Sequence, residues 1–330
     1  MIGRSESESE VVCAESAYGV PVDADRLATF DSSAAGFALT ALITALQRDQ
    51  VVLVQNVPEA DADRITGDVA QHLGLRVNLQ MQAAFAGMHG HRENVSQYFM
   101  TVNRRNDYDI VLPHSEGTRF ANIQLASLYC HQNTTDGGTT ILLNTDERSP
   151  MWGVLRELVS RLDRHARKLT AMECATARVR CQVDPCEDIL SPEDTMIQER
   201  ESPLAGVRFF WALTKLRKRR SVVLERDVHT YWDSVCTADA DAVGESVRLM
   251  SSLRLLKEPP AGGPRVNERA MADSRKVWSS GVSYESLFKA MIVRRLLPGE
   301  LIIQNNLTWT HAASNWTPGS GSRRIVAAFA

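Results

Sequence analysis

The chain has 330 residues, 44% of them hydrophobic, and a formal net charge of −3 at pH 7. A chain of this length can bury a large core, in one big domain or two smaller ones. The weak negative charge gives no general attraction for nucleic acid or an anionic membrane. No apolar run approaches the ~18–20 residues that a membrane span needs. Composition therefore argues against a nucleic-acid or membrane partner.

The N-terminal residues 1–20 begin with MIGRSESESEVV, which is polar and acidic. This stretch lacks the apolar core of a secretory signal, and we expect a disordered tail. The cysteines show no paired CxxC spacing that would indicate a zinc site. Free thiols in a reducing cytoplasm are the simplest interpretation. The six cysteines are Cys13, Cys130, Cys174, Cys181, Cys186 and Cys236.

The first part of the chain alternates between helical and strand patterns. Residues 36–50 carry apolar positions at helical spacing, 51–57 (VVLVQNV) form a short buried strand, and 61–75 are a second amphipathic helix. Residues 95–145 change to strands with turn punctuation. Residues 150–170 predict another helix.

The second part is irregular and then returns to strands. The mixed stretch 171–265 contains a basic run at 216–220, which we interpret as a solvated helix face. Strand patterns recur at 296–306 and 323–329. Strands on both sides of an irregular insert predict a β-barrel or sandwich closed by sequence-distant strands. We expect one domain over 21–330, with helical decoration and an insert at about 165–270.

The segment LPHSEGTRF contains His114 and Glu116, two residues apart. Because side chains on a strand alternate faces with period two, both can point into one cavity. Two histidines and one carboxylate form a triad that binds iron(II) and leaves three coordination positions open. A lone HxE pair occurs by chance in many proteins, so the pair needs a third ligand.

A third ligand occurs far along the chain. His311 follows a strand and a polar turn, and Arg323 and Arg324 open the last strand about a dozen residues later. An anionic cosubstrate needs a fixed counter-charge, and the planar guanidinium suits a carboxylate better than lysine does. By strand alternation the two arginines face opposite ways, so at least one of them is structural. The order HxE, long gap, His and Arg is more specific than any single element.

At these residues the chain resembles the taurine dioxygenase/TfdA-like iron(II)/2-oxoglutarate oxygenases, which include clavaminate synthase. The resemblance covers most of residues 38–330 and is weakest at 171–270. LPHSE matches the family's HxD/E motif, DGGTTILLN resembles its GG-x-T turn, PGELIIQNN resembles its PGD-containing strand, and RRI matches its Arg-Arg-hydrophobic motif. The resemblance implies a mainly β, α+β fold: a double-stranded β-helix (jelly-roll) core with flanking helices and a lid formed by the insert.

The resemblance also implies the cofactors and the reaction. His114, Glu116 and His311 would hold Fe(II), and the cosubstrates would be 2-oxoglutarate and O2. Thr140 falls where a threonine contacts 2-oxoglutarate, and Arg324 rather than Arg323 would bind its distal carboxylate. The implied reaction hydroxylates, desaturates or cyclises an unactivated C–H of a small molecule, with release of succinate and CO2. Because Glu116 is retained, halogenation, which needs a small residue there, is disfavoured.

Two departures from the family concern substrate and metal. The family often carries a further arginine four residues after the cosubstrate arginine, and this chain has Ala328 there. An acidic substrate held in that way is therefore not expected. Asn305 and Asn306 replace the family's Asp-Asn pair, which we expect to be a mild change because other acceptors can orient a metal-bound histidine.

The substrate is only loosely indicated. An apolar patch at 207–211 (VRFFW) within a charged insert suggests a medium-sized substrate, such as an amino-acid- or peptide-derived intermediate of secondary metabolism. Both Trp residues flanking His311 suit core packing or a place in the cavity wall. Candidate substrate contacts are Arg119, Asn122, Gln124, Trp309 and Trp316.

Three other interpretations are weaker. His89 and His91 form a second possible metal pair, but a solvated loop explains them more simply. A cupin-type metal-dependent isomerase or hydrolase would keep the metal but would need neither Thr140 nor Arg324. A binding or scaffold protein on a decayed enzyme fold would not need an intact triad. We expect a cytoplasmic enzyme with a small-molecule substrate, and the pattern leaves its oligomeric state open.

Overall fold

The computed structural model describes residues 18–88, 92–102, 105–117, 122–163, 168–232, 239–273 and 276–330. Most of the predicted tail lies outside these ranges. Tyr18 and Val20, however, are buried, and the Tyr18 hydroxyl donates a hydrogen bond to Glu245 Oε2 at 2.6 Å. Residues 18–20 therefore belong to the folded domain, which corrects the predicted boundary at residue 20. No helix in the described ranges combines the length and hydropathy needed to cross a bilayer.

The larger sheet has six strands in the order β1-β2-β13-β5-β15-β3. The β1–β2 pair is parallel and the other pairs are antiparallel. Neighbours come from opposite ends of the chain, as expected for a sheet closed by sequence-distant strands. The strands are β1 (Ala28–Asp31), β2 (Val51–Gln55), β3 (Met100–Thr101), β5 (Leu125–Asn133), β13 (Leu301–Asn305) and β15 (Arg323–Phe329).

The smaller sheet has four antiparallel strands in the order β12-β6-β14-β4. It also joins early and late segments, because β6 and β4 each pair with β14. Its strands are β4 (Val111–His114), β6 (Thr140–Thr145), β12 (Phe288–Arg294) and β14 (Trp309–Ala313).

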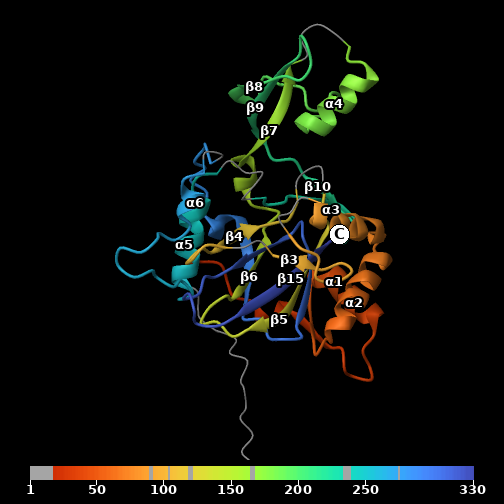
Figure 1. The fold of residues 1–330 in the computed structure, drawn as a ribbon, viewed down its shortest axis with the longest axis vertical. Helices are drawn as coiled ribbons and strands as arrows, with labels where there is room; N and C mark the ends of the chain where they lie inside the picture. Colours follow the sequence, from red (N-terminus) through yellow and green to blue (C-terminus); the bar gives the residue numbers. More distant parts are fainter. Residues whose placement is uncertain are drawn as a thin grey trace, which may run out of the picture.

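The two sheets pack face to face around a shared core, with strands of both visible in Figure 1. Val51 and Leu53 of β2 point into this core, whereas Val52 and Val54 point to the opposite face. The period-two alternation explains why β2 is apolar throughout: both of its faces are buried. From the smaller sheet, Leu142, Ile292 and Trp309 complete the inner layer.

Helices cover the outer faces of both sheets. The orange α1 to α3 lie to one side of the larger sheet (Figure 1) and bury Leu42, Leu46, Ile65 and Val69 with it. The outer face of the smaller sheet packs against α5 and α7. The bounds are α1 (Leu39–Asp49), α2 (Glu59–His72), α3 (Arg76–Met88), α5 (Ala242–Ser252), α6 (Glu268–Met271) and α7 (Tyr284–Leu287), with 3-10 turns at Ala24–Arg26 and Pro150–Gly153.

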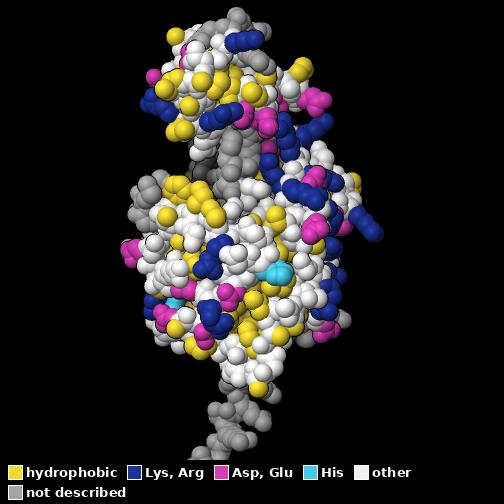
Figure 2. All heavy atoms as spheres, turned by 90° about the vertical axis from the view of Figure 1, so that its right-hand side faces the viewer, with side chains coloured by type: hydrophobic (Ala, Val, Ile, Leu, Met, Phe, Trp, Pro, Cys, Tyr) yellow, Lys and Arg dark blue, Asp and Glu magenta, His cyan; other side chains and the backbone are white. Residues whose placement is uncertain are grey.

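A separate three-stranded sheet, β7-β9-β8, stands above the two-sheet core with α4 (Figure 1). It has its own small core, and Figure 2 shows hydrophobic side chains on its surface as well. A two-stranded hairpin of β10 and β11 follows it in the chain. The bounds are β7 (Arg156–Asp163), α4 (Ala171–Cys181), β8 (Thr195–Arg200), β9 (Arg208–Lys215), β10 (Arg219–Ser221) and β11 (Arg226–Val228).

This unit corrects three sequence predictions. The helix predicted at 150–170 is instead a 3-10 turn followed by strand β7, because pairing with β9 buries Arg161 in ion pairs with Asp188 and Asp194. The basic run at 216–220 lies in a turn and the start of β10, not on a helix. The patch at 207–211 belongs to β9, where Phe209 packs in the unit's own core.

The ring of His229 stacks on Trp152 at a centroid distance of 4.8 Å and an interplanar angle of 4°. Burial, together with the charge of Lys218, lowers the pKa of His229 to about 4. The folded state therefore favours the neutral ring, so this contribution to stability is complete above the unfolded pKa of ~6.5 and is lost as pH falls towards 4.

We expect His229→Phe to keep the stacking and to remove part of the acid sensitivity. Between pH 7 and pH 5 the wild type should lose about 1 kcal/mol more unfolding free energy than the variant, after allowance for the partial exposure of the ring. Urea unfolding at both pH values measures this difference. Equal losses in the two proteins would show that His229 does not titrate on unfolding.

Candidate metal and cosubstrate site

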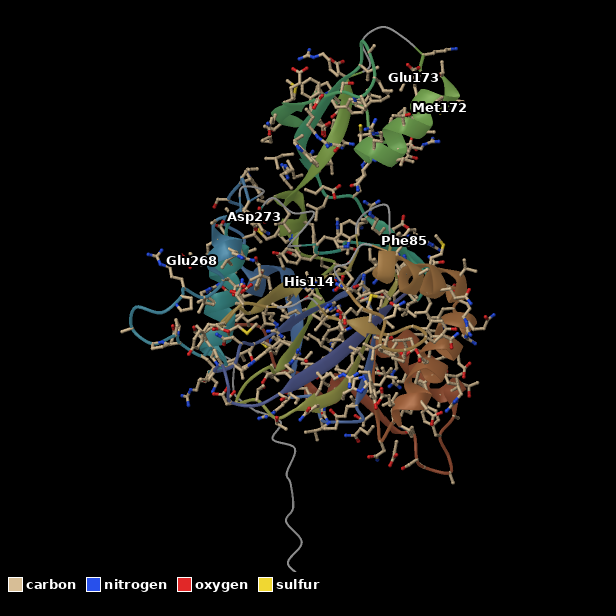
Figure 3. All side chains as sticks on the ribbon, viewed as in Figure 1. Phe85, His114, Met172, Glu173, Glu268 and Asp273 are labelled. Carbon is tan, nitrogen blue, oxygen red and sulfur yellow. The ribbon has the colours of Figure 1, made fainter. Side chains whose placement is uncertain are left out.

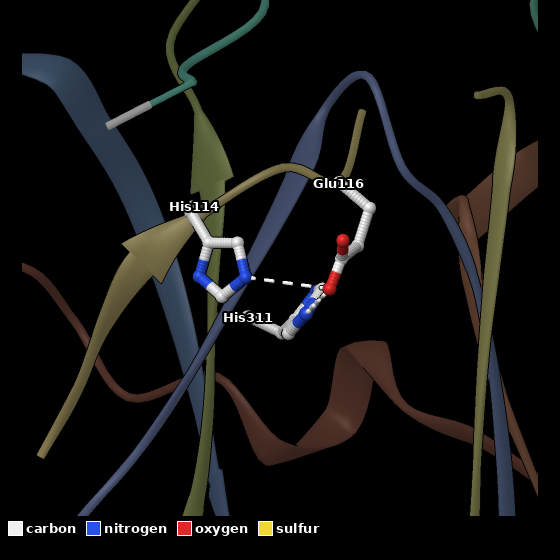
Figure 4. A group of neighbouring side chains, drawn as sticks. All are labelled: His114, Glu116 and His311. Atoms are coloured by element: carbon white, nitrogen blue, oxygen red, sulfur yellow. Dashed lines mark ion pairs between the residues drawn. The ribbon is translucent and has the colours of Figure 1, made fainter. Parts of the chain in front are cut away.

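His114, Glu116 and His311 form one cluster, drawn in Figure 4. His114 is the last residue of β4 and lies directly opposite His311 of the antiparallel β14, so both imidazoles project from the same face. Glu116 follows two residues after His114. Its Oε1 lies 3.5 Å from His114 Nε2 and 3.6 Å from His311 Nε2. The candidate ligand atoms all lie within 4.8 Å of one another, close enough to share one metal ion.

The protonation states suit metal binding. Burial alone would raise the pKa of Glu116, but hydrogen bonds with both histidines and the charge of Arg92 hold it well below its usual value. Burial also lowers the pKa of His311. The Nδ1 atom of His114 lies 2.7 Å from the Leu112 carbonyl, which selects the tautomer with a free Nε2 facing the cluster.

The other histidine is oriented by an amide. Gln304 is fully buried, and its Nε2 donates to the Trp309 carbonyl at 2.9 Å and lies 3.3 Å from His311 Nδ1. Its Oε1 has no partner among the described residues. The bond to the Trp309 carbonyl fixes this orientation of the amide, in which the same Nε2 can donate to His311 Nδ1. This neighbour supplies the alternative orienting group that the sequence left unnamed.

Asn306 fixes the backbone of Glu116. Its Oδ1 accepts from the Glu116 N–H at 2.8 Å, and its Nδ2 donates to the carbonyls of Glu116 at 2.9 Å and Ile123 at 2.8 Å. The side chain is fully buried. We expected the replacement of the family's Asp-Asn pair by Asn305 and Asn306 to be a mild change. In the structure, Asn306 is hydrogen-bonded directly to the backbone of Glu116, a candidate metal ligand.

We expect Asn306→Ala to weaken metal binding by ~10–100-fold, the range found for groups that orient ligands. The loss of three buried hydrogen bonds should also lower stability by about 2–4 kcal/mol. Asn305→Ala is the matched control, because Asn305 is equally buried but its amide donates to Ser221 Oγ instead. Titration with Mn(II) distinguishes the two variants: equal metal affinities would contradict the assigned role of Asn306.

A cavity of about 260 Å³ extends from the cluster between the two sheets. Three guanidiniums line it, those of Arg92, Arg105 and Arg323, and the carboxylates of Glu116 and Asp109 also border it. Arg92 Nη2 pairs with Glu116 Oε1 at 3.3 Å, and its guanidinium lies 4.9 Å from the Phe329 ring centroid. The cavity therefore combines a metal-ligand set with an excess of positive charge.

Thr140, a candidate cosubstrate contact, lines this cavity together with Arg323. The side chain of Thr140 is buried, and its Oγ1 has no hydrogen-bond partner among the described residues. Arg323 Nε donates to the Gly138 carbonyl at 3.1 Å. Burial lowers the pKa of Arg323 to about 10, so the guanidinium stays charged at neutral pH.

The cavity lining favours Arg323 over Arg324 as the candidate cosubstrate arginine. Arg324 is exposed and does not line the cavity, whereas Arg323, Ile325 and Ala327 all do. These three alternate along β15, so Arg324 must point to the other face. The position four residues after Arg323 is Ala327, so the family's further arginine is absent in this register as well.

The candidate substrate contacts lie in different places relative to the cavity. Arg119 lies outside the described residues, as do His89 and His91. Trp309 is a core residue, fully buried between the sheets. Asn122 is exposed and does not line the cavity.

Gln124 is bound to main chain rather than turned towards the cavity. Its Nε2 donates to the Arg220 carbonyl at 3.1 Å, and its Oε1 accepts from the Val222 N–H at 3.0 Å. Trp316 borders a second cavity that shares Arg105 and Arg323 with the first. Of the four candidates within the described ranges, Trp316 is the one that lines a cavity next to the site.

The predicted lid does not reach the cavity in this structure. No described residue between 141 and 310 lines it, and the wall comes from segments near the triad, β5, β6, β14 and β15. Figure 3 shows His114 in the two-sheet core and Met172 and Glu173 on α4 in the protruding unit. A lid role for the insert stays a prediction.

Comparisons with known proteins give distant likenesses. No protein-family model and no curated protein matches the chain. Among solved structures, AAD-2 in complex with Mn(II) and N-oxalylglycine is 11% identical, with a TM-score of 0.40, over 88% of this chain and 87% of that one.

Two further solved structures are similarly distant. PvcB from Pseudomonas aeruginosa is 11% identical, with a TM-score of 0.39, over 92% of this chain and 86% of its own. A putative alpha-ketoglutarate dependent 2,4-D dioxygenase from Burkholderia xenovorans is 9% identical, with a TM-score of 0.38, over 93% and 94%. TM-scores this low assign no function to this chain.

Proposed function

We propose that this protein is an iron(II)/2-oxoglutarate-dependent oxygenase on a jelly-roll core. The observation that carries the proposal is the coincidence, in one cavity, of an open two-histidine, one-carboxylate cluster with a half-buried arginine and a buried threonine hydroxyl that has no partner among the described residues. The first part suits iron(II) with open coordination positions. The second part suits the distal carboxylate of a dicarboxylic 2-oxo acid.

The residues that line the cavity suit both iron(II) and 2-oxoglutarate. His114, Glu116 and His311 would hold the iron, and Arg323 with Thr140 would hold the far end of 2-oxoglutarate. When bound, iron and 2-oxoglutarate supply the activation of O2, with release of succinate and CO2. The protein positions both groups and excludes water from the enclosed site.

The substrate proposed from sequence remains a small molecule with an unactivated C–H, from an amino acid or peptide. Hydroxylation, desaturation and ring formation are all compatible with a retained Glu116. A cupin-type isomerase or hydrolase would need neither Arg323 nor Thr140, because it uses no 2-oxoglutarate. The presence of both residues in the cavity disfavours that alternative. The free state of all four described cysteines supports a cytoplasmic location: Cys130, Cys174, Cys181 and Cys186.

Consumption of 2-oxoglutarate in air tests this proposal without a known substrate. We expect the purified protein with iron(II) and ascorbate to release succinate slowly, and faster when the true substrate is among an added set of amino acids and peptides. Omission of iron or oxygen should stop the release. Succinate release that is equally fast in a Glu116→Ala variant would contradict the proposal.

A further inference from the structure

Two guanidiniums line the same cavity. Arg105 and Arg323 both line the cavity beside the triad and the second cavity next to it. Both lie against the ring of Trp316, at 4.7 Å and 5.8 Å from its centroid. Within the described ranges, neither forms an ion pair: Arg105 Nη1 donates to the Ser314 carbonyl at 3.1 Å, and Arg323 Nε donates to Gly138.

This arrangement is electrostatically incomplete. Burial, together with the nearby charge of Arg323, lowers the pKa of Arg105 to about 9. Asp109 is close enough to offset part of the effect, but its carboxylate accepts from the Asn106 N–H in a local turn at 3.1 Å. Two like charges in a desolvated site repel each other unless an anion lies between them. The site is therefore suited to an anionic ligand.

Main-chain contacts place Arg105 at the same end of the cavity as Thr140. Thr140 pairs with Ala313 across the β6–β14 ladder, and Ser314, whose carbonyl accepts from Arg105, is the next residue. The Ser314 N–H in turn donates to the Thr139 carbonyl at 2.9 Å. His311 lies further back along β14. Arg105 thus lies near the expected distal end of the cosubstrate rather than over the metal.

We propose that Arg105 is a second clamp on the distal carboxylate of the cosubstrate, opposite Arg323, and that it sets the selectivity for dicarboxylic over monocarboxylic 2-oxo acids. This inference rests on the proposed function and adds to it a residue outside every motif that the sequence offered. A site built to bind a charged group rejects an analogue that lacks the group, because the buried polar atoms are then left unpaired.

The test compares two cosubstrates that share one end. 2-Oxoglutarate and 2-oxopentanoate both carry the 2-oxo acid that chelates iron, but only the former has a distal carboxylate. Each acid is titrated anaerobically into the iron(II)-loaded protein, and the weak visible charge-transfer band of the chelate reports binding without turnover. We expect the wild type to bind 2-oxoglutarate at least ~100-fold more tightly than 2-oxopentanoate.

Arg105→Met should reduce the affinity for 2-oxoglutarate by ~10–100-fold and change that for 2-oxopentanoate by less than about threefold. Arg105→Lys should recover part of the selectivity. Arg324→Met is the matched control, because Arg324 is the exposed neighbour of Arg323, and it should keep the wild-type ratio. Mn(II) binding and thermal unfolding of each variant establish that the fold and the triad are intact.

The outcomes separate the two proposals. A wild-type selectivity ratio in Arg105→Met, or equal losses for both acids, would overturn the clamp while leaving the oxygenase proposal standing. If Arg105→Met does not fold, Arg105→Lys and Arg105→Gln provide the same comparison, and unchanged ratios in both would overturn it. A wild type that forms no band with either acid would remove the proposed function, and the clamp with it.

Discussion

Glu116→Ala is expected to abolish metal binding. The Glu116 carboxylate lies between both histidines and is the anionic member of the cluster, so its loss leaves two imidazoles and no anionic ligand. Loss of a direct ligand should exceed the ~10–100-fold effect of an outer-sphere partner. In the wild type, Mn(II) or Fe(II) at 100 times its Kd should raise the unfolding free energy by about 2.7 kcal/mol. In the variant the same metal concentration should give no stabilisation.

Ser115→Ala is the matched control for this prediction. Ser115 lies between two of the ligands in sequence and is buried, but its Oγ has no hydrogen-bond partner among the described residues and its backbone N–H donates to the Tyr231 carbonyl. Its replacement should leave metal affinity unchanged. The comparison uses thermal unfolding with and without metal, and paramagnetic resonance of free Mn(II). Wild-type stabilisation by metal in Glu116→Ala would show that the cluster is not the metal site.

Arg323→Met is expected to separate stability from cosubstrate binding. Removal of a half-buried cation that forms no ion pair within the described ranges should leave the apo protein as stable as the wild type or slightly more stable. The same change should cost about 3 kcal/mol in binding of 2-oxoglutarate, or ~100-fold in affinity. Calorimetric titration of the Mn(II)-loaded protein measures the second effect, and thermal unfolding measures the first.

The substitution of Arg324 tests which of the two arginines of β15 faces the cavity. Arg324→Met removes the same chemical group from the opposite face of the strand. Its affinity for 2-oxoglutarate should stay within about twofold of the wild type. A larger loss in Arg324→Met than in Arg323→Met would restore the choice made from sequence and contradict the orientation seen in the structure.

The spacing of apolar residues along the chain correctly predicted several helices and strands. The helix at 36–50, the strands near 51–57, 296–306 and 323–329, and the sheet closed by distant segments all appear in the structure. The triad residues come together because β4 and β14 are neighbours with His114 opposite His311. The two-residue spacing of His114 and Glu116 follows from the alternation of side chains along a strand, and this alternation can be predicted from the sequence.

Long-range contacts account for what sequence did not predict. β7 has leucines at helical spacing, but its structure is decided by pairing with β9 and by the buried ion pairs of Arg161. Arg92 and Arg105 resemble ordinary solvated charges in sequence, and only their position over the cavity distinguishes them. Period-two alternation showed that Arg323 and Arg324 face opposite ways but could not say which face is the cavity.

Anaerobic addition of iron(II) and 2-oxoglutarate to the wild-type protein tests the central claim most directly. We expect a weak visible charge-transfer band that saturates at one equivalent of iron per chain and is absent from Glu116→Ala and His114→Ala. Exposure to air should then bleach the band with formation of succinate. A wild type that shows no band, or a band that persists in His114→Ala, would contradict the assignment of this site.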